Sequence, residues 1–138
     1  MHRGYFGAEN FNSSQGHIVY KYFKIEEFAS PDEPGSGSMM DSDLLEKLDL
    51  ARDICGFPLI INSGYRSVAH NKKVGGVKNS SHLLGLAVDI HCTDSRKRFI
   101  LLDALMVAGF TRIGVAGTYI HADVDTHPEK RQCIIWTY

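Results

Sequence analysis

Two histidines and one aspartate, His82, Asp89 and His121, have the residue types of a metal site. Imidazole nitrogens and carboxylate oxygens are ligands that Zn²⁺ accepts. His82 and Asp89 lie seven residues apart and are separated by small residues, so the chain can turn sharply from a loop into a strand and aim both side chains at one point. His121 would supply the third ligand from another β-type run. Two histidines and a carboxylate leave one tetrahedral position for water, which is typical of a catalytic zinc centre. Spacing alone leaves open that each is an ordinary core or surface residue.

The elements that would position these residues follow the hydrophobic pattern of the chain. Apolar residues at helical spacing predict a helix over 43–55, with Asp43 as its capping residue. A second helix is expected over 95–108, with Phe99, Leu102 and Met106 on one face, and a short helix over 67–75. Short β-type runs are expected at 59–61, 86–90, 112–115, 119–124 and 132–137. This order of elements predicts an α+β domain with a small, mainly antiparallel sheet.

The composition is that of one globular domain and excludes several classes of protein. The 138 residues carry a formal net charge of −1, and Lys and Arg are scattered, so we expect no nucleic-acid partner. No apolar run approaches the roughly 18–20 residues of a membrane span. We interpret 1–20 as an N-terminal extension of uncertain structure and 21–138 as the functional domain, and we expect a monomer. No signal peptide is evident after Met1, so the chain is expected to stay in the cytoplasm until release at cell lysis, or to act at the cell wall if a leader was removed.

Several ordered motifs resemble those of the zinc D-Ala-D-Ala peptidases, a superfamily that also includes phage endolysins, murein endopeptidases and the hedgehog signalling domain. The pattern Ser80-x-His82-x-x-Gly85-x-Ala87-x-Asp89 matches the signature of that superfamily position for position. Further agreement is found in Ser63-Gly64-Tyr65-Arg66-Ser67, His70-Asn71, Val74-Gly75-Gly76, Gly114 and His121-x-Asp123. The likeness runs from about Phe23 to the end and is strong for the small single-domain branch found in phages.

The resemblance implies the hedgehog/DD-peptidase fold, in which helices pack on one face of a small sheet. It places His82, Asp89 and His121 on the metal ligands of the family and thereby implies Zn²⁺ as cofactor. Arg66 falls on an arginine that contacts the substrate near the scissile carbonyl or the terminal carboxylate. Ser80 matches a serine near the metal that makes a hydrogen bond to the substrate or to a ligand.

The general base is not fixed by the resemblance. Many relatives carry an acidic residue three positions before the last histidine ligand, or a histidine two positions before it; here Thr118 and Tyr119 stand there. The nearest acid is Asp123, and residues two apart on a strand point to the same face. Asp123 is therefore the candidate for the base or for a carboxylate that orients His121. Tyr119 shares that face and is a candidate for substrate binding, with core filling as the alternative.

The function implied by the resemblance is hydrolysis of D-Ala-containing bonds in peptidoglycan stem peptides, as a D,D-carboxypeptidase or a murein endopeptidase, with an endolysin-like setting. Two alternatives stay open: a zinc-binding module without catalysis, favoured by the missing acid before His121, and a phage structural or tail-associated protein. Asp125 and His127 are expected at the surface, and Trp136 and Tyr138 in the core or in the wall of a cleft.

Overall fold

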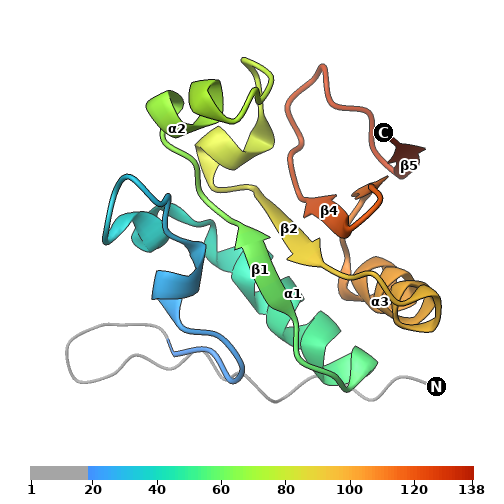
Figure 1. The fold of residues 1–138 in the computed structure, drawn as a ribbon. Coiled ribbons are helices and arrows are strands. Elements are labelled where there is room, and N and C mark those ends of the chain that lie inside the picture. The colour runs from blue at the N-terminus through green and yellow to red at the C-terminus, as the bar shows by residue number, and fades with distance from the viewer. Residues whose placement is uncertain (1–18) are drawn as a thin grey trace.

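The computed structural model describes residues 19–138, so the N-terminal extension expected over 1–20 lies outside the described residues except for its last two. The described part contains three α-helices, three 3-10 helices and five strands (Figure 1). In chain order these are η1 (Ile25–Phe28), η2 (Ser36–Met39), α1 (Ser42–Cys55), β1 (Ile60–Ser63), α2 (Val68–Lys73), η3 (Ser81–Leu84), β2 (Ala87–His91), α3 (Ser95–Ala108), β3 (Arg112–Val115), β4 (Tyr119–Asp123) and β5 (Ile134–Thr137). None of these helices is long and apolar enough to cross a membrane.

The five strands form one sheet in the order β1-β2-β4-β3-β5. Neighbouring strands pair antiparallel, except that β5 runs parallel to β3 at the edge. The α+β class and the mainly antiparallel sheet predicted from the sequence are thereby confirmed. In the pairing of β1 with β2, the register shifts between Ile61 and Ser63, which brings Ser63 opposite Asp89.

The hydrophobic core lies between the sheet and the two long helices, α1 and α3; in Figure 1, α1 lies behind the sheet and α3 at its lower right. The sheet contributes Val88, Ile90, Ile113 and Ile120, and each of these is at most 1% exposed. Burying one such side chain stabilises the fold by roughly 1.5–3 kcal/mol. Because successive side chains of a strand point to opposite faces, the residues between these positions point away from the core.

The first long helix begins at Ser42, one residue earlier than predicted, and its capping residue lies two positions before the predicted Asp43. The carboxylate of Asp41 accepts a hydrogen bond from the amide of Leu44 at 2.9 Å, so Asp41, and not Asp43, is the capping residue of α1. The amide of Asp41 in turn donates to the carbonyl of Gly85 at 2.9 Å. The start of the helix is therefore tied to the turn that leads into β2.

The second long helix begins as predicted but buries a different face. Asp94 caps α3 and accepts from the amide of Lys97 at 2.9 Å. Phe99 and Met106 are 76% and 49% exposed, so the stripe expected to contain them does not face the core. The buried positions are Leu101, Ala104, Leu105 and Ala108. Their spacing of three, four and seven residues also fits a helical stripe, and it is the stripe that packs on α1.

Candidate metal centre and cleft

One row of residues crosses all five strands and carries the polar chemistry of the sheet. Ser63 on β1 lies opposite Asp89 on β2, and Asp89 lies opposite His121 on β4. The row continues through Gly114 on β3 to Trp136 on β5. The adjacent rows carry the buried aliphatic residues of the core, so this row points to the opposite face of the sheet. Two of the predicted ligands are thus side by side although they lie 32 residues apart in the chain.

The third predicted ligand, His82, enters from η3 at the end of the sheet. Ser80 caps this short helix and accepts a hydrogen bond from the amide of His82 at 3.3 Å. Gly85 ends it with a φ of +69°, and a Cβ there would lie 2.1 Å from the carbonyl oxygen of Met39, so only glycine fits. The ring of His82 donates from Nδ1 to the carbonyl of Gly64 at 2.7 Å, which turns Nε2 towards the sheet.

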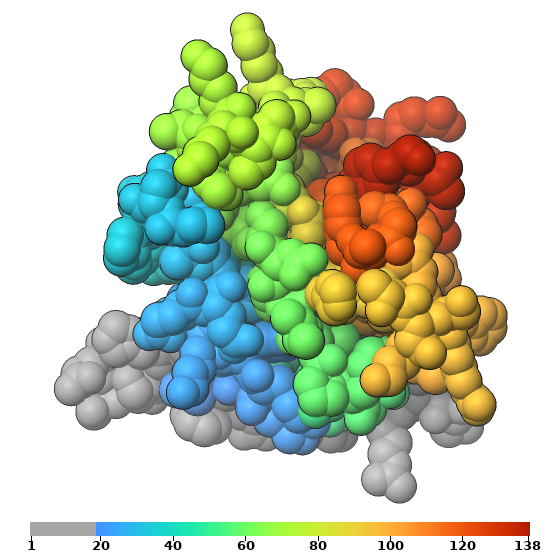
Figure 2. All heavy atoms as spheres, in the orientation of Figure 1, coloured from blue at the N-terminus to red at the C-terminus, as the bar shows by residue number. Residues whose placement is uncertain are grey.

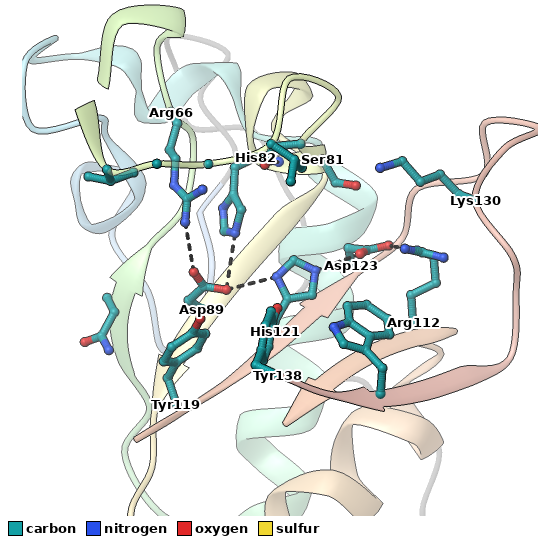
Figure 3. A pocket seen from close by; sticks show the side chains of 17 residues that line it. Arg66, Ser81, His82, Asp89, Arg112, Tyr119, His121, Asp123, Lys130 and Tyr138 are labelled. Atoms are coloured by element: carbon teal, nitrogen blue, oxygen red, sulfur yellow. Dashed lines mark hydrogen bonds and ion pairs between the residues drawn. The ribbon is translucent and has the colours of Figure 1, made fainter. Parts of the chain in front are cut away.

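Three ligand atoms converge on one point, as Figure 3 shows. Asp89 Oδ1 lies 3.2 Å from Nε2 of His82 and 2.9 Å from Nδ1 of His121. All three atoms lie within 4.8 Å of one another, and all three residues are buried. With ligand bonds of about 2.0 Å, neighbouring ligand atoms of a tetrahedral zinc site are separated by about 3.3 Å. The spacing of the cluster therefore fits a zinc ion.

The hydrogen bonds on the far side of each imidazole show why a cation belongs between these atoms. A carbonyl oxygen only accepts, so Nδ1 of His82 carries the proton, and Nε2 of His121 has the carboxylate of Asp123 as acceptor at 2.7 Å. Each neutral ring then presents an unprotonated nitrogen to Asp89 Oδ1. Electron-rich atoms this close repel one another unless a proton or a metal cation lies between them. The donor set accordingly fits Zn²⁺ held by the three predicted residues.

The same cluster shifts the acid–base behaviour of its members. Burial raises the pKa of Asp89, but the hydrogen bonds with His121 and His82 outweigh burial and hold the pKa well below its usual range. Burial lowers the pKa of His121, yet the hydrogen bonds with Asp123 and Asp89 bring it above its ordinary value. A proton on His121 must leave before a cation enters. Cation binding should therefore release a proton and strengthen as the pH rises.

Asp123, predicted as the base or as an orienting carboxylate, lies behind His121 and not beside the ligand atoms. Its side chain is 1% exposed and accepts three hydrogen bonds. The donors are Nε2 of His121 at 2.7 Å, Nε of Arg112 at 2.9 Å and the amide of Asp125 at 3.2 Å. A buried carboxylate on the outer nitrogen of a ligand histidine is the arrangement that fixes ring orientation and tautomer.

Arg66 lies against the other side of Asp89, and its guanidinium is held by three acceptors. Nη2 donates to Asp89 Oδ2 at 3.1 Å, Nε to Ser63 Oγ at 3.0 Å and Nη1 to Asn71 Oδ1 at 3.2 Å. Gly76 packs directly on Asn71 and on the guanidinium, because a Cβ there would lie 2.0 Å from Asn71 Oδ1 and 3.1 Å from Arg66 Nη1. The side chain of Arg66 is 15% exposed, so its remaining N–H groups can meet a ligand.

The cluster forms the floor of a cleft of about 640 Å³. Trp136 and Tyr138 build one wall, with ring centroids 5.5 Å from His121 and 5.8 Å from Tyr119 respectively. Gly114 makes room for this wall, because a Cβ there would lie 2.8 Å from Trp136 Nε1 and from the Tyr138 hydroxyl. All seven residues predicted for the site border this one cleft, namely Arg66, Ser80, His82, Asp89, Tyr119, His121 and Asp123.

Other site residues were missed by the reasoning from sequence. Asp125, expected at the surface, is fully buried and accepts from the hydroxyl of Ser81 at 2.6 Å. It also lies 2.6 Å from Nδ1 of His127. The bond to Ser81 ties η3, which carries His82, to the segment that follows β4. No motif spacing marks it, because the two partners are 44 residues apart.

A two-histidine, one-carboxylate cluster at the floor of an open cleft is the arrangement of a catalytic zinc centre. Comparison with known proteins agrees with this class of protein. Residues 21–125 match the model of the Peptidase M15 family, and the chain belongs to that family. Over 66 residues, 48% of the chain, it is 39% identical to the zinc D-Ala-D-Ala carboxypeptidase of Streptomyces albus G. The aligned stretch spans only 26% of that relative. Family and relative both imply Zn²⁺ as the cofactor, as predicted.

Proposed function

We propose that the chain is a zinc-dependent peptidase that hydrolyses D-Ala-containing bonds of peptidoglycan, with His82, Asp89 and His121 as its metal ligands. The observation that carries this proposal is the convergence of three ligand atoms beside Arg66 on the floor of the cleft. The Peptidase M15 family supports the reaction class, and the name of the Streptomyces albus G relative supports the kind of bond. The choice of substrate rests on that name. The aligned stretch covers 26% of the relative, so the substrate is part of the proposal.

The residues that border the cleft would have separate roles in hydrolysis. Zinc would polarise the scissile carbonyl and lower the pKa of an attacking water. Arg66 is planar and always charged, and its free N–H groups would bind the carbonyl oxygen as negative charge develops there. Ser80 uses its oxygen to cap η3, which leaves its O–H to donate to the substrate. Tyr119, on the floor of the cleft, would hold the peptide by its ring and hydroxyl.

Within this proposal Asp123 orients His121 and does not accept the proton of the water. Three donors already occupy its oxygens, and its side chain is 1% exposed. As acceptor for Nε2 of His121, it keeps the proton on that nitrogen and frees Nδ1 for the metal.

Metal analysis and a hydrolysis assay together test the proposal. We expect about one zinc per chain and release of product from purified peptidoglycan that a chelator abolishes. Released D-Ala would identify a carboxypeptidase, and separated stem peptides an endopeptidase. Zinc without hydrolysis would support the alternative of a non-catalytic zinc module. If no zinc binds, even after it is added back, the three ligands do not act together and the proposal fails.

The endolysin-like setting and the monomeric state are further parts of the proposal. The likeness of the motifs to those of the phage branch supports the setting, and a loss of turbidity when the protein is added to permeabilised bacteria would test it. A monomer should elute in size-exclusion chromatography at the chain mass of 15.4 kDa.

A further inference from the structure

The charges that border the cleft do not cancel one another. Arg66 contacts Asp89 and Arg112 contacts Asp123, so each guanidinium has a carboxylate within 3.1 Å. Lys130 is a third cation at the cleft. Within residues 19–138, no carboxylate forms an ion pair with Lys130. Among these side chains the cleft therefore has an excess positive charge at Lys130, before any metal is counted.

A hydrogen bond between two segments of the chain holds Lys130 at the cleft. It belongs to the segment between β4 and β5, and its Nζ donates to the carbonyl of Asn79 at 2.8 Å, directly before Ser80. In Figure 2 the yellow-green and red segments that carry these residues lie next to each other in the upper part of the molecule. An ammonium group has three N–H donors, so two remain for a ligand.

Arg112 adds a second donor near Lys130. Its Nε binds Asp123 and its Nη1 donates to the carbonyl of Arg131 at 2.6 Å. In the described part of the chain, no hydrogen bond is found for its Nη2. Figure 3 shows Lys130 and Arg112 on one side of the metal cluster and Arg66 on the other. A peptide that crosses the cluster would thus meet a cationic group on each side.

We propose that Lys130, with Nη2 of Arg112 beside it, forms a subsite for a carboxylate on the leaving-group side of the scissile bond. The inference rests on the proposed function and deepens it. A peptide that ends in D-Ala-D-Ala carries a carboxylate on the carbon next to the scissile nitrogen, and so does a cross-link made through the D-centre of diaminopimelate. With Arg66 at the carbonyl, the leaving group extends to the opposite side of the cluster. The subsite therefore selects a leaving group that bears a free acid.

The sequence offers a direct probe of this subsite. Trp136 is the single tryptophan of the chain and borders the cleft, so its fluorescence reports binding there. The ligands are two ketomethylene isosteres of acetyl-D-Ala-D-Ala, one a free acid and one a carboxamide. Both lack the scissile amide bond between the two D-Ala units and cannot be cleaved there. The zinc-loaded full chain is compared with Lys130→Met, Lys130→Arg and Lys78→Met. Lys78 is exposed and does not border the cleft, so its variant loses the same charge without removing a donor that borders the cleft.

The measured quantity is the ratio of the two dissociation constants. We expect the unaltered chain to bind the acid at least about tenfold more tightly than the carboxamide, as a hydrogen bond to a charged group would give. Lys130→Met should bring the ratio close to one, Lys130→Arg should keep most of it, and Lys78→Met should leave it unchanged. An unchanged ratio in Lys130→Met overturns the subsite. The subsite is also overturned if neither isostere binds.

Hydrolysis of acetyl-D-Ala-D-Ala, measured in parallel, separates this inference from the proposed function. A preference for the acid that depends on Lys130, without hydrolysis of either this dipeptide or purified peptidoglycan, would refute the peptidase and leave the subsite standing. Hydrolysis with a preference that does not depend on Lys130 would refute the subsite and leave the peptidase standing. The thermal midpoint of each variant shows whether loss of the bond to Asn79 has altered the fold.

Discussion

Replacing Asp123 by asparagine tests whether this carboxylate orients His121. Asparagine keeps the shape of the side chain but removes its charge, and its amide N–H₂ can face the ring. Nε2 of His121 would then lose its acceptor, and the ring would favour the tautomer with the proton on Nδ1. Nδ1 is the nitrogen that lies 2.9 Å from Asp89 Oδ1, so the lone pair meant for the metal would be lost.

The size of the effect follows from the contacts of Asp123. A hydrogen bond to a charged group contributes roughly 1.5–3 kcal/mol, and each 1.4 kcal/mol is a factor of ten in affinity. We therefore expect zinc affinity to fall about 10–100-fold, the range typical for loss of a carboxylate behind a ligand histidine. The side chain of Arg112 is 11% exposed and would lose its ion-pair partner, so the free energy of unfolding should also fall, by about 3 kcal/mol.

Competition with a chromophoric chelator measures the affinity, at one pH and one salt concentration, alongside the hydrolysis rate. Asp103→Asn on the exposed side of α3 is the matched control, because it removes the same charge away from the cleft and should change neither quantity. The reasoning is refuted if Asp123→Asn binds zinc as tightly as the unaltered chain. If it does so and has lost hydrolysis, Asp123 is the residue that accepts the proton.

Three further changes address other parts of the site. Gly114→Ala would place a Cβ 2.8 Å from Nε1 of Trp136, so a shift of the tryptophan fluorescence and slower hydrolysis are expected with zinc still bound; an unchanged spectrum would contradict this. Arg66→Lys keeps the charge but loses the planar fork, and kcat should fall about 100-fold at unchanged zinc content; an unaltered kcat would exclude the assigned role. Burial raises the pKa of Asp125, but hydrogen bonds from Ser81 and a neighbouring histidine outweigh burial and lower it from 3.8. The stabilisation from Asp125 is thus present above that value and is lost as the pH falls through the lowered pKa, so Asp125→Asn should lose less thermal stability in acid; parallel midpoint curves would contradict the argument.

The sequence predicted three residues whose ligand atoms the structure brings together, because short motifs that resemble those of a known family carry this geometry. His82 reaches Asp89 through a turn that needs glycine at position 85, and that requirement is visible in the sequence. The alternation of a strand places His121 and Asp123 on one face, and the structure gives them a direct hydrogen bond. In both cases the chemistry depends on neighbours along the chain.

Contacts between distant segments could not be predicted in this way. Arg112 meets Asp123 because β3 and β4 pair in one particular register, and no local pattern fixes that register. The bond between Ser81 and Asp125 joins a helix to a loop, and both residues look like ordinary surface residues in the sequence. The prediction of which face α3 buries was also wrong. Phe99 and Leu105 both lie on apolar stripes, and only packing against α1 decides between them.

The core and the candidate site are two consequences of one strand register. On β4, Ile120 and Ala122 are completely buried on the helix side, while His121 between them points into the cleft. A slip of one residue would turn His121 into the core and expose the aliphatic side chains, so the burial that stabilises the sheet also fixes the ligand beside Asp89. The hydrophobic face therefore holds His121, the proposed ligand, in place without any contribution from a metal. Asp123 is the next residue on the same face of β4 and is held by Arg112. Its contact then needs only to set the tautomer of the His121 ring, whose position is already determined.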